Sequence, residues 1–358
     1  MPRWNLLPVA ADEMSSVDRV STIILWPLLA IAVGLIIWTI IRKRKLARSN
    51  REKYGDGTNG TGTNSGTKTK PRKNEPPRTW TKPEDYREHH EVAWSGDPEH
   101  FSPSELDWPL AVSAVMGICS GDPWDELRFA NLDSARTGLR EAWQIRSREE
   151  LLAQLHWLLR EGHRVGFDDE IAEWRALDNA AAERLHKQLA SSKGDEAKER
   201  AWRMQQVLAN TRGIRGVRFE AWDLARAAML CRASYSLGWL IEDEAVDTLN
   251  LISAQLQRTY SGWEELGKHF TLAQWYWGGS SDLRSKQEDA HSVSRQAALL
   301  DPKRGPWAYV VWNRLIPESG LLLVEALVSE GIVTELPAPA PTPLAQVIDD
   351  ATAARLTT

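Results

Sequence analysis

Residues 220–237 read EAWDLARAAMLCRASYSL, a run in which apolar and small side chains recur every three or four positions. Trp222, Ala225 and Met229 share one side of an α-helix at this spacing. Gly238 follows the run directly, and glycine at this position is typical of a helix end. The pattern therefore predicts a helix over residues 220–237.

The same periodicity continues on both sides of this stretch. Upstream, Ser147-Arg148-Glu149-Glu150 has the spacing of a capping box and begins a predicted helix that ends at Gly162. Asp168-Asp169-Glu170 places carboxylates at the predicted start of another helix, which continues to Leu189. Downstream, Glu242-Asp243-Glu244 begins a further helix in the same way. Since no sustained alternation of polar and apolar residues competes with this pattern, an all-α, multi-helix globular domain is predicted.

Tryptophan is unusually abundant, with 18 among 358 residues. A tryptophan side chain buries a large apolar area and leaves only one N–H group to satisfy. Most of these tryptophans fall on the predicted apolar faces of helices, so we interpret them as packing residues of a helical core. A ligand-binding aromatic surface is the alternative interpretation.

An uncharged apolar segment lies near the N-terminus, at Val20–Ile41 (VSTIILWPLLAIAVGLIIWTII). A helix needs about 20 such residues to cross the roughly 30 Å hydrocarbon core of a bilayer. Four basic residues follow this segment directly: Arg42, Lys43, Arg44 and Lys45. Because positive charges flank membrane spans on their cytoplasmic side, the sequence predicts a single-pass protein of the cell membrane. Residues 1–19 are then outside the cytoplasm, and the remaining chain is inside.

A cleaved signal peptide is the competing interpretation of this segment, because Ala30-Ile31-Ala32 is similar to a small-residue cleavage site. Cleavage there would leave the apolar Val33–Ile41 at the new N-terminus. In a signal peptide the basic residues precede the apolar run, whereas here they follow it. Both features favour an uncleaved anchor that contacts the lipid bilayer through residues 20–41.

Residues 42–83 form a basic, flexible linker in this interpretation. Residues 42–82 contain 13 Lys and Arg against 3 Asp and Glu, and Tyr54–Lys73 is rich in Gly, Thr and Asn. Such a composition buries too little apolar surface to fold by itself. The basic residues of 42–53 are expected to contact anionic lipid headgroups, each contributing about 1 kcal/mol. Nucleic-acid binding is not expected, because aromatic residues are nearly absent from the linker.

Residues 84–335 form the predicted helical cytoplasmic domain. The repeated prolines of Leu336–Leu344 (LPAPAPTPL) end regular structure, so residues 336–358 are interpreted as a Pro-rich C-terminal tail. Cys119 and Cys231 lie far apart and lack metal or redox spacing, which fits a reduced compartment.

Candidate chemical groups are sparse along the chain. His89-His90-Glu91 and the set His156, His163, Asp168 and Asp169 are the best metal or acid–base candidates, but neither has the i, i+4 spacing of a helical zinc site. The sequence contains no phosphate-binding loop, dinucleotide-binding glycine motif or nucleophile-elbow serine. We therefore expect neither a metal nor a cofactor.

The densest polar pattern is Glu220-Ala221-Trp222-Asp223-Leu224-Ala225-Arg226. On a helix, Arg226 reaches both the carboxylate of Asp223 and the indole face of Trp222. One interpretation is a binding site. The other is a structural clamp at the edge of a helix bundle, because a single ion pair on a helix is common and contributes little.

The same residues resemble the bacterial domain-of-unknown-function family numbered 1266, over about residues 220–315, and the upstream segment Trp143–His163 is compatible with it. The resemblance rests on Ala221-Trp222-Asp223-Leu224-Ala225-Arg226 with Arg232 and Tyr235, on Ser261-Gly262-Trp263-Glu264-Glu265, on Trp275-Tyr276-Trp277-Gly278-Gly279 and on Pro306-Trp307. It implies a helical domain and supplies no established activity or catalytic residue.

The leading functional hypothesis is a membrane-tethered helical module that binds an unidentified protein partner. The alternative is an enzyme of unknown reaction with a pocket near Trp222, Asp223, Arg226 and Trp263. The candidate binding residues are Trp222, Asp223, Arg226, Trp263, Trp275 and Trp277.

Overall fold

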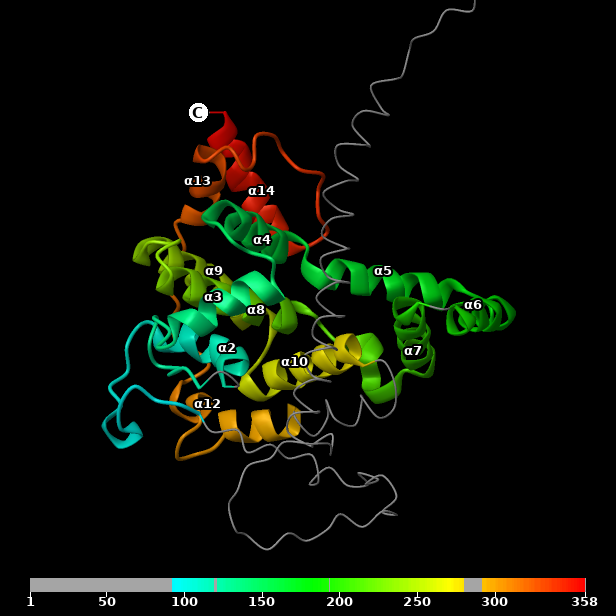
Figure 1. Ribbon diagram of the computed structural model, residues 1–358, viewed down its shortest axis with the longest axis horizontal. Helices are drawn as coiled ribbons and strands as arrows, with labels where there is room; N and C mark the ends of the chain where they lie inside the picture. The colour runs from blue at the N-terminus through cyan, green and yellow to red at the C-terminus, as the bar shows by residue number, and fades with distance from the viewer. Residues whose placement is uncertain (1–91, 119–120, 193, 280–291, 358) are drawn as a thin grey trace, which may run out of the picture. The chain divides into compact units, whose positions relative to one another are not determined.

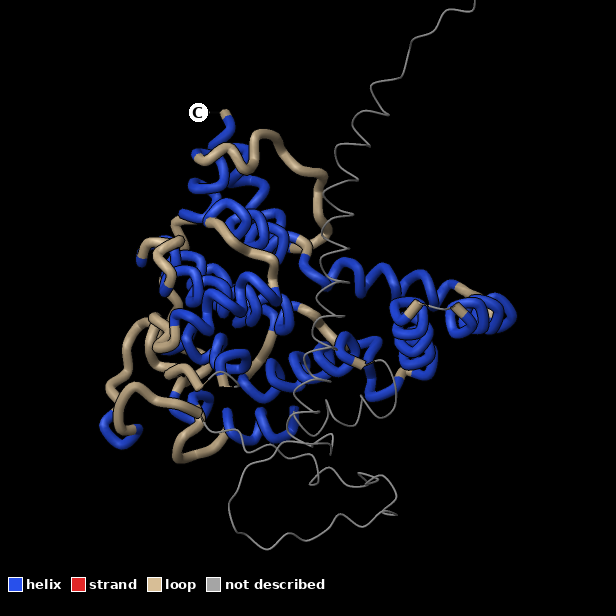
Figure 2. Tube along the Cα trace, viewed as in Figure 1, coloured by secondary structure: helices blue, strands red, loops and turns tan. Residues whose placement is uncertain are grey.

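The computed structural model describes residues 92–118, 121–192, 194–279 and 292–357. All regular structure in these ranges is helical (Figure 1), and the trace through them contains only helices and loops (Figure 2). The elements are η2 (Pro98–His100), α2 (Asp107–Gly117), α3 (Leu132–Ala142), α4 (Arg148–Arg160), α5 (Gly162–Ala176), α6 (Asn179–Ser191), α7 (Asp195–Ala209), η3 (Thr211–Gly216), α8 (Glu220–Ser236), α9 (Glu242–Thr259), α10 (Trp263–Gly278), α12 (Pro306–Tyr309), α13 (Leu322–Ser329) and α14 (Pro343–Leu356). The predicted all-α fold class is confirmed for this part of the chain.

The predicted N-terminus 1–19, anchor Val20–Ile41 and linker 42–83 all lie outside the described residues. Among the residues that the structure does describe, no helix is long and apolar enough to cross a bilayer. The membrane anchor therefore stays a prediction from the sequence.

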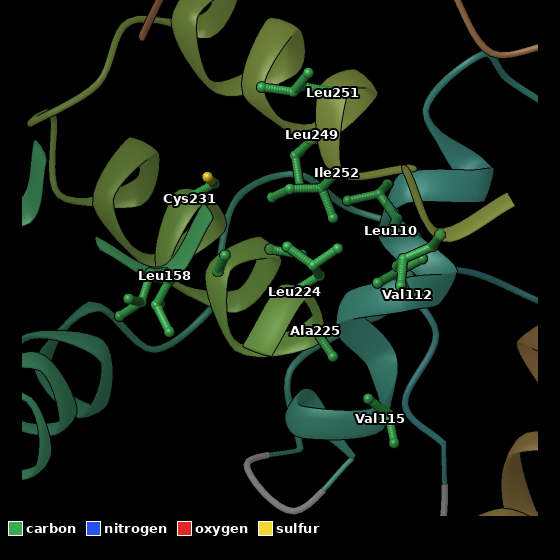
Figure 3. Packing of buried hydrophobic residues seen from close by; sticks show 14 of the residues in the cluster. Leu110, Val112, Val115, Leu158, Leu224, Ala225, Cys231, Leu249, Leu251 and Ile252 are labelled. Atoms are coloured by element: carbon green, nitrogen blue, oxygen red, sulfur yellow. The ribbon is translucent and has the colours of Figure 1, made fainter. Parts of the chain in front are cut away.

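Helix α8 lies at the centre of the helical unit and packs against α2, α3, α4, α9 and α10. Figure 3 shows Leu224 of α8 among Leu110 of α2 and Ile252 of α9, while Leu158 of α4 lies on another side of α8. Nearly every residue of α8 is buried, so the helix has no solvent face, in contrast to the one-sided apolar stripe expected for a surface helix. Its many alanines allow the neighbouring helices to approach closely.

Two hydrophobic cores meet at α8. The larger core combines side chains from residues 92–159 with side chains from residues 221–348. The second core is formed by α5, α6, α7, η3 and the C-terminal half of α10. Trp222 packs against both cores. The larger core includes side chains that precede residue 162 and side chains that follow residue 219. The fold therefore does not divide at residue 220 into two domains that each have their own core.

The start of α5 differs from the prediction. The sequence places a helix start at Asp168-Asp169-Glu170, whereas α5 already begins at Gly162, so these carboxylates lie inside the helix. The predicted continuous helix is also interrupted, because the side chain of Asp178 accepts a 2.7 Å hydrogen bond from Ala181 N and caps a separate helix, α6. The prediction was wrong because the cap of α5 comes from another helix, as described below.

Residues 336–358, interpreted above as a tail, contain a helix of the same packed unit. Helix α14 packs against α13 and α4, and its Leu344 and Ile348 side chains are buried. Arg160 of α4 holds it in place, donating from Nε and Nη2 to the two carboxylate oxygens of Asp349 at 2.6 and 2.9 Å. The prolines before α14 therefore connect two helices instead of ending the fold.

Neutralising Asp349 is expected to loosen α14. The guanidinium of Arg160 is buried, so Asp349→Asn removes its bidentate counter-charge, at a cost of about 1.5–3 kcal/mol. Limited proteolysis of the full chain should then cut the Pro-rich segment before α14 several times faster. Asp350→Asn is the control, since Asp350 is exposed and, among the described residues, accepts a hydrogen bond only from Gln346. Equal protease resistance of the two variants would contradict this role of Asp349.

Candidate functional site

Asp223 is the centre of a buried cluster of charges. Its side chain is fully buried, and the backbone N–H groups of His163 and Arg164 donate to its two carboxylate oxygens, each at 3.0 Å. These N–H groups belong to the first turn of α5, whose own sequence supplies no side-chain cap. A carboxylate from α8 therefore caps α5 from outside and complements the positive end of its dipole.

Two arginines share this single carboxylate. Arg226 Nη2 donates to Asp223 Oδ1 at 2.6 Å, and Arg164 Nη1 is 3.3 Å from Oδ2. Arg164 also donates to the last carbonyls of α4, at 2.7 Å to Leu158 O and 2.5 Å to Leu159 O. With two backbone donors and two arginines, the acceptor positions of Asp223 are occupied. The carboxylate therefore joins α4, α5 and α8.

Gly162 makes this junction of α4, α5 and α8 possible. Its φ of +59° lies in the left-handed region, which glycine adopts without the penalty that a Cβ atom brings. A Cβ atom at this position would also meet the carboxylate of Asp223 and the guanidinium of Arg164 at distances that real Cβ atoms do not show. The chain can therefore turn from α4 into α5 directly above the buried carboxylate only with glycine here.

His163 lies beside the pair formed by Asp223 and Arg226. Its Nδ1 atom is 2.6 Å from Arg226 Nη2 and 3.4 Å from Asp223 Oδ1. Because a guanidinium donates and never accepts, Nδ1 is the acceptor, and the neutral ring carries its proton on Nε2. Nε2 makes no hydrogen bond to any residue that the structure describes.

The charge states of the cluster follow from its burial and its contacts. Burial and the charge of Arg226 together lower the pKa of His163 to about 4, although Asp223 opposes the shift. Burial opposes ionisation of Asp223, but the charges of Arg226 and Arg164 favour the carboxylate, and the pKa of Asp223 is lowered to about 2. At neutral pH the cluster thus contains one carboxylate, two guanidinium groups and a neutral imidazole.

The free energy of unfolding is expected to fall as the pH decreases from about 6.5 to 4. In this window the unfolded chain protonates His163 and the native chain does not, so acid favours the unfolded state. The slope approaches about 1.4 kcal/mol per pH unit for each such histidine. Burial also lowers the pKa of His156 to about 4, so His156 adds to the slope. Asp223 contributes at lower pH, because stability from a depressed carboxyl pKa is lost between about pH 4 and 2.

Urea unfolding at pH 7, 6 and 5 measures this dependence. His163→Gln, which retains a hydrogen-bond acceptor, should flatten the slope between pH 6 and 5 whatever its effect on stability at pH 7. An unchanged slope in both His163→Gln and His156→Gln would contradict the assignment.

The guanidinium of Arg226 lies close to two tryptophan rings. Its Cζ atom is 4.7 Å from the ring centroid of Trp222, on the same helix, and 5.4 Å from that of Trp143, directly after α3. Both tryptophans are half-buried. Arg226 Nε donates to Trp222 O at 3.1 Å, and Nη1 makes no hydrogen bond to any described residue. Two N–H groups of this arginine therefore remain available.

The ring of His163 is flanked in the same way. Its centroid is 5.0 Å from the ring of Trp157 on α4 and 4.4 Å from that of Trp277 on α10, both in edge-to-face geometry. These two tryptophans are also half-buried. We call the resulting arrangement the tryptophan site; it consists of Trp143, Trp157, His163, Trp222, Asp223, Arg226 and Trp277.

The structure brings some of the predicted binding residues together and places others elsewhere. The predicted residues in the tryptophan site are Trp222, Asp223, Arg226 and Trp277. Trp263 is buried in the larger core, where its ring stacks on Trp307 at 5.5 Å. Trp275 is buried in the second core, 5.2 Å from the ring of Trp202. The basic residues Arg42, Lys43, Arg44 and Lys45 lie outside the described ranges.

Four residues of this region were not among the sequence candidates: Trp143, Trp157, Gly162 and Arg164. His163 was considered only as a metal ligand or an acid–base group, whereas its Nδ1 atom accepts a hydrogen bond from Arg226. Within the described ranges, no group of three or more His, Cys, Asp or Glu could hold a metal ion. The one sequence signal for the missed residues was the compatibility of Trp143–His163 with the family pattern. The residues around Gly162 give no sign that it contacts the carboxylate of Asp223, which follows much later in the chain.

Two further residues of the family pattern support the fold. Arg232 is fully buried and donates to Ser113 Oγ at 2.9 Å and to Pro123 O at 2.7 Å, which fixes the connection between α2 and α3. Burial lowers its pKa to about 10, although nearby carboxylates oppose the shift. The ring of Tyr235 lies 4.9 Å from the guanidinium of Arg128 in the same connection. These residues therefore act in packing, not at the tryptophan site.

Comparison with known proteins agrees with the resemblance found in the sequence. Residues 138–312 match the model of a family described as "Protein of unknown function (DUF1266)", a range that contains the whole tryptophan site. The chain is 26% identical over 155 residues to "Uncharacterized protein YbeR" of Escherichia coli (strain K12), an alignment that covers 40% of this chain and 58% of that protein. No solved structure matches the chain. The segment 138–312, which contains the tryptophan site, is therefore similar to the DUF1266 family of proteins of unknown function.

Proposed function

We propose that this chain is a membrane-tethered helical binding module that contacts a protein partner through the tryptophan site. The observation that supports the proposal most is the position of Arg226, which has two unused N–H groups and contacts the half-buried rings of Trp143 and Trp222. Tryptophan and arginine are the residue types that dominate the energetics of protein interfaces, because they combine a large apolar surface with directional hydrogen bonds.

An enzyme with a pocket near Trp222, Asp223, Arg226 and Trp263 is less well supported. A general base works best with a pKa near the working pH, whereas the pKa of Asp223 is about 2 and that of His163 about 4. The carboxylate of Asp223 is also fully engaged by its four donors. Within the described ranges, no second carboxylate contacts Arg226 or His163. A fully hydrogen-bonded carboxylate and a neutral imidazole are better suited to holding a binding surface rigid than to transferring protons.

The membrane tether is the second part of the proposal and comes from the sequence. Val20–Ile41 would span the bilayer, and the basic residues of 42–53 would contact anionic headgroups on the cytoplasmic face. A reporter fused after Lys82 should then be accessible only from the cytoplasm, and a tag at residue 1 only from outside. Accessibility of the Lys82 reporter from outside the cell would refute the orientation.

A photo-reactive phenylalanine analogue at position 277 of the intact, membrane-embedded chain tests the binding surface. We expect it to form a cross-link to a discrete partner. The control position is Leu315, whose side chain is 90% exposed and lies outside the tryptophan site. The proposal predicts a cross-link at position 277 and none at position 315. The same cross-linked product from both positions, or from position 315 alone, would argue against the tryptophan site as the contact surface.

A further inference from the structure

We propose that the tryptophan site binds an oxyanion, a carboxylate or a phosphate ester, that is attached to a flat apolar group. This inference rests on the proposed binding function and specifies the chemical group that is recognised. It follows from the charge balance of the site, from its unused hydrogen-bond donors and from the rings around them.

The buried cluster has more positive than negative charge. Arg164 and Arg226 are both guanidinium cations, Asp223 is the one carboxylate among the described residues that contacts them, and His163 is neutral. Two carbonyls at the C-terminal end of α4 compensate Arg164. Arg226 shares Asp223 with Arg164 and with the first turn of α5, so its charge is only partly balanced. An uncompensated buried charge is unfavourable, and a bound anion beside Arg226 would remove the imbalance.

The unused polar atoms of the site are all hydrogen-bond donors. Arg226 is 6% exposed and has two free N–H groups on Nη1, and His163 is 7% exposed and carries a free proton on Nε2. The indole Nε1 of Trp222 is buried without a hydrogen-bond partner. An ionised carboxylate or phosphate offers only hydrogen-bond acceptors, so it complements these donors. An ammonium group has only donors of its own and could not accept from them.

The tryptophans favour a flat apolar body next to the oxyanion. The rings of Trp143 and Trp222 both contact the guanidinium of Arg226, and those of Trp157 and Trp277 both contact the ring of His163. All four rings are half-buried, so each keeps part of its surface open to a ligand. An aromatic group on the ligand can pack against these rings while its oxyanion meets Arg226. Inorganic phosphate has the charge but lacks this contact.

Calorimetric titration of the purified full chain in detergent tests the proposal, with benzoate, phenyl phosphate, inorganic phosphate and benzylammonium as probes. At least one of the two aromatic anions should bind about tenfold more tightly than inorganic phosphate. Benzylammonium should not bind. The tighter of the two aromatic anions identifies the recognised group as a carboxylate or a phosphate ester. Equal affinity for inorganic phosphate and both aromatic anions, tighter binding of benzylammonium, or no binding of any anion would overturn the proposal.

Variants locate the binding. Trp143→Leu and Trp277→Leu should each weaken the aromatic anion about tenfold, and Arg226→Lys should abolish binding if the variant folds. The matched control is Trp239→Leu, because Trp239 is also half-buried but packs on the larger core outside the site. Equal losses in Trp239→Leu and in the two site variants would overturn the assignment. Cross-linking from position 277 without anion binding would refute this inference alone, and anion binding without a cross-link would refute the protein-binding function alone.

Discussion

Asp223→Asn is expected to lower the free energy of unfolding of this chain by about 3–5 kcal/mol, the usual cost of breaking a buried ion pair by removing one partner. The asparagine has nearly the same shape, but its NH₂ group donates where the backbone N–H of His163 or Arg164 must also donate. The variant therefore leaves two buried guanidinium groups without a counter-charge and the first turn of α5 without its cap. Urea unfolding of the full chain, followed by loss of helical circular dichroism, measures the effect.

The control for this prediction is Asp133→Asn in α3. Asp133 and Arg136 form an ion pair at the same i, i+3 spacing as Asp223 and Arg226, but both side chains are exposed. An exposed pair of this kind contributes about 0–1 kcal/mol. The contrast between the two substitutions isolates burial, because the spacing and the chemical change are the same. Similar losses of unfolding free energy at positions 133 and 223 would show that Asp223 does not stabilise the junction of α4, α5 and α8.

Gly162→Ala is expected to destabilise the fold by about 3–5 kcal/mol. The left-handed backbone at Gly162 costs an alanine about 1–2 kcal/mol, and a Cβ atom forced into a packed site costs typically about 1–3 kcal/mol. The atoms that must move belong to Asp223 and Arg164, so the variant also disturbs the cap of α5. Thermal unfolding monitored by circular dichroism measures the loss.

A glycine-to-alanine substitution one turn further along α5 should instead increase the stability of the fold. Gly166 lies inside the helix, and a Cβ atom there would meet nothing within 4 Å. Gly166→Ala is therefore expected to stabilise the chain by about 0.5–1 kcal/mol, because alanine is the better helix former. If both alanine variants changed stability in the same direction, Gly162 would have no special role. Because Gly162 and Asp223 are in contact, their double variant should lose less than the sum of the two single losses.

Two of the helices that the sequence predicted correctly, α4 and α9, have local start signals. Ser147 accepts a hydrogen bond from Glu150 N at 3.2 Å and begins α4, as the capping-box spacing indicated. The side chain of Glu244 accepts from Ile241 N at 3.0 Å at the start of α9. Donor and acceptor are three residues apart in both cases, so a short window of sequence contains the whole interaction. The start of α5 was predicted wrongly because its cap lies on another helix.

The amino-acid sequence by itself determined that the described part of this chain is helical, where α4, α8 and α9 lie, and that a clamp centred on Asp223 and Arg226 was one of two interpretations. Helical periodicity and capping are properties of neighbouring residues, which is why they can be read without the fold. Only the tertiary structure decided that His163 and Trp277 join this clamp while Trp263 packs elsewhere. Helix α8 is buried on every side, so the spacing of its residues does not tell which helix each one meets. That choice is made by the packing of helices far apart in the chain.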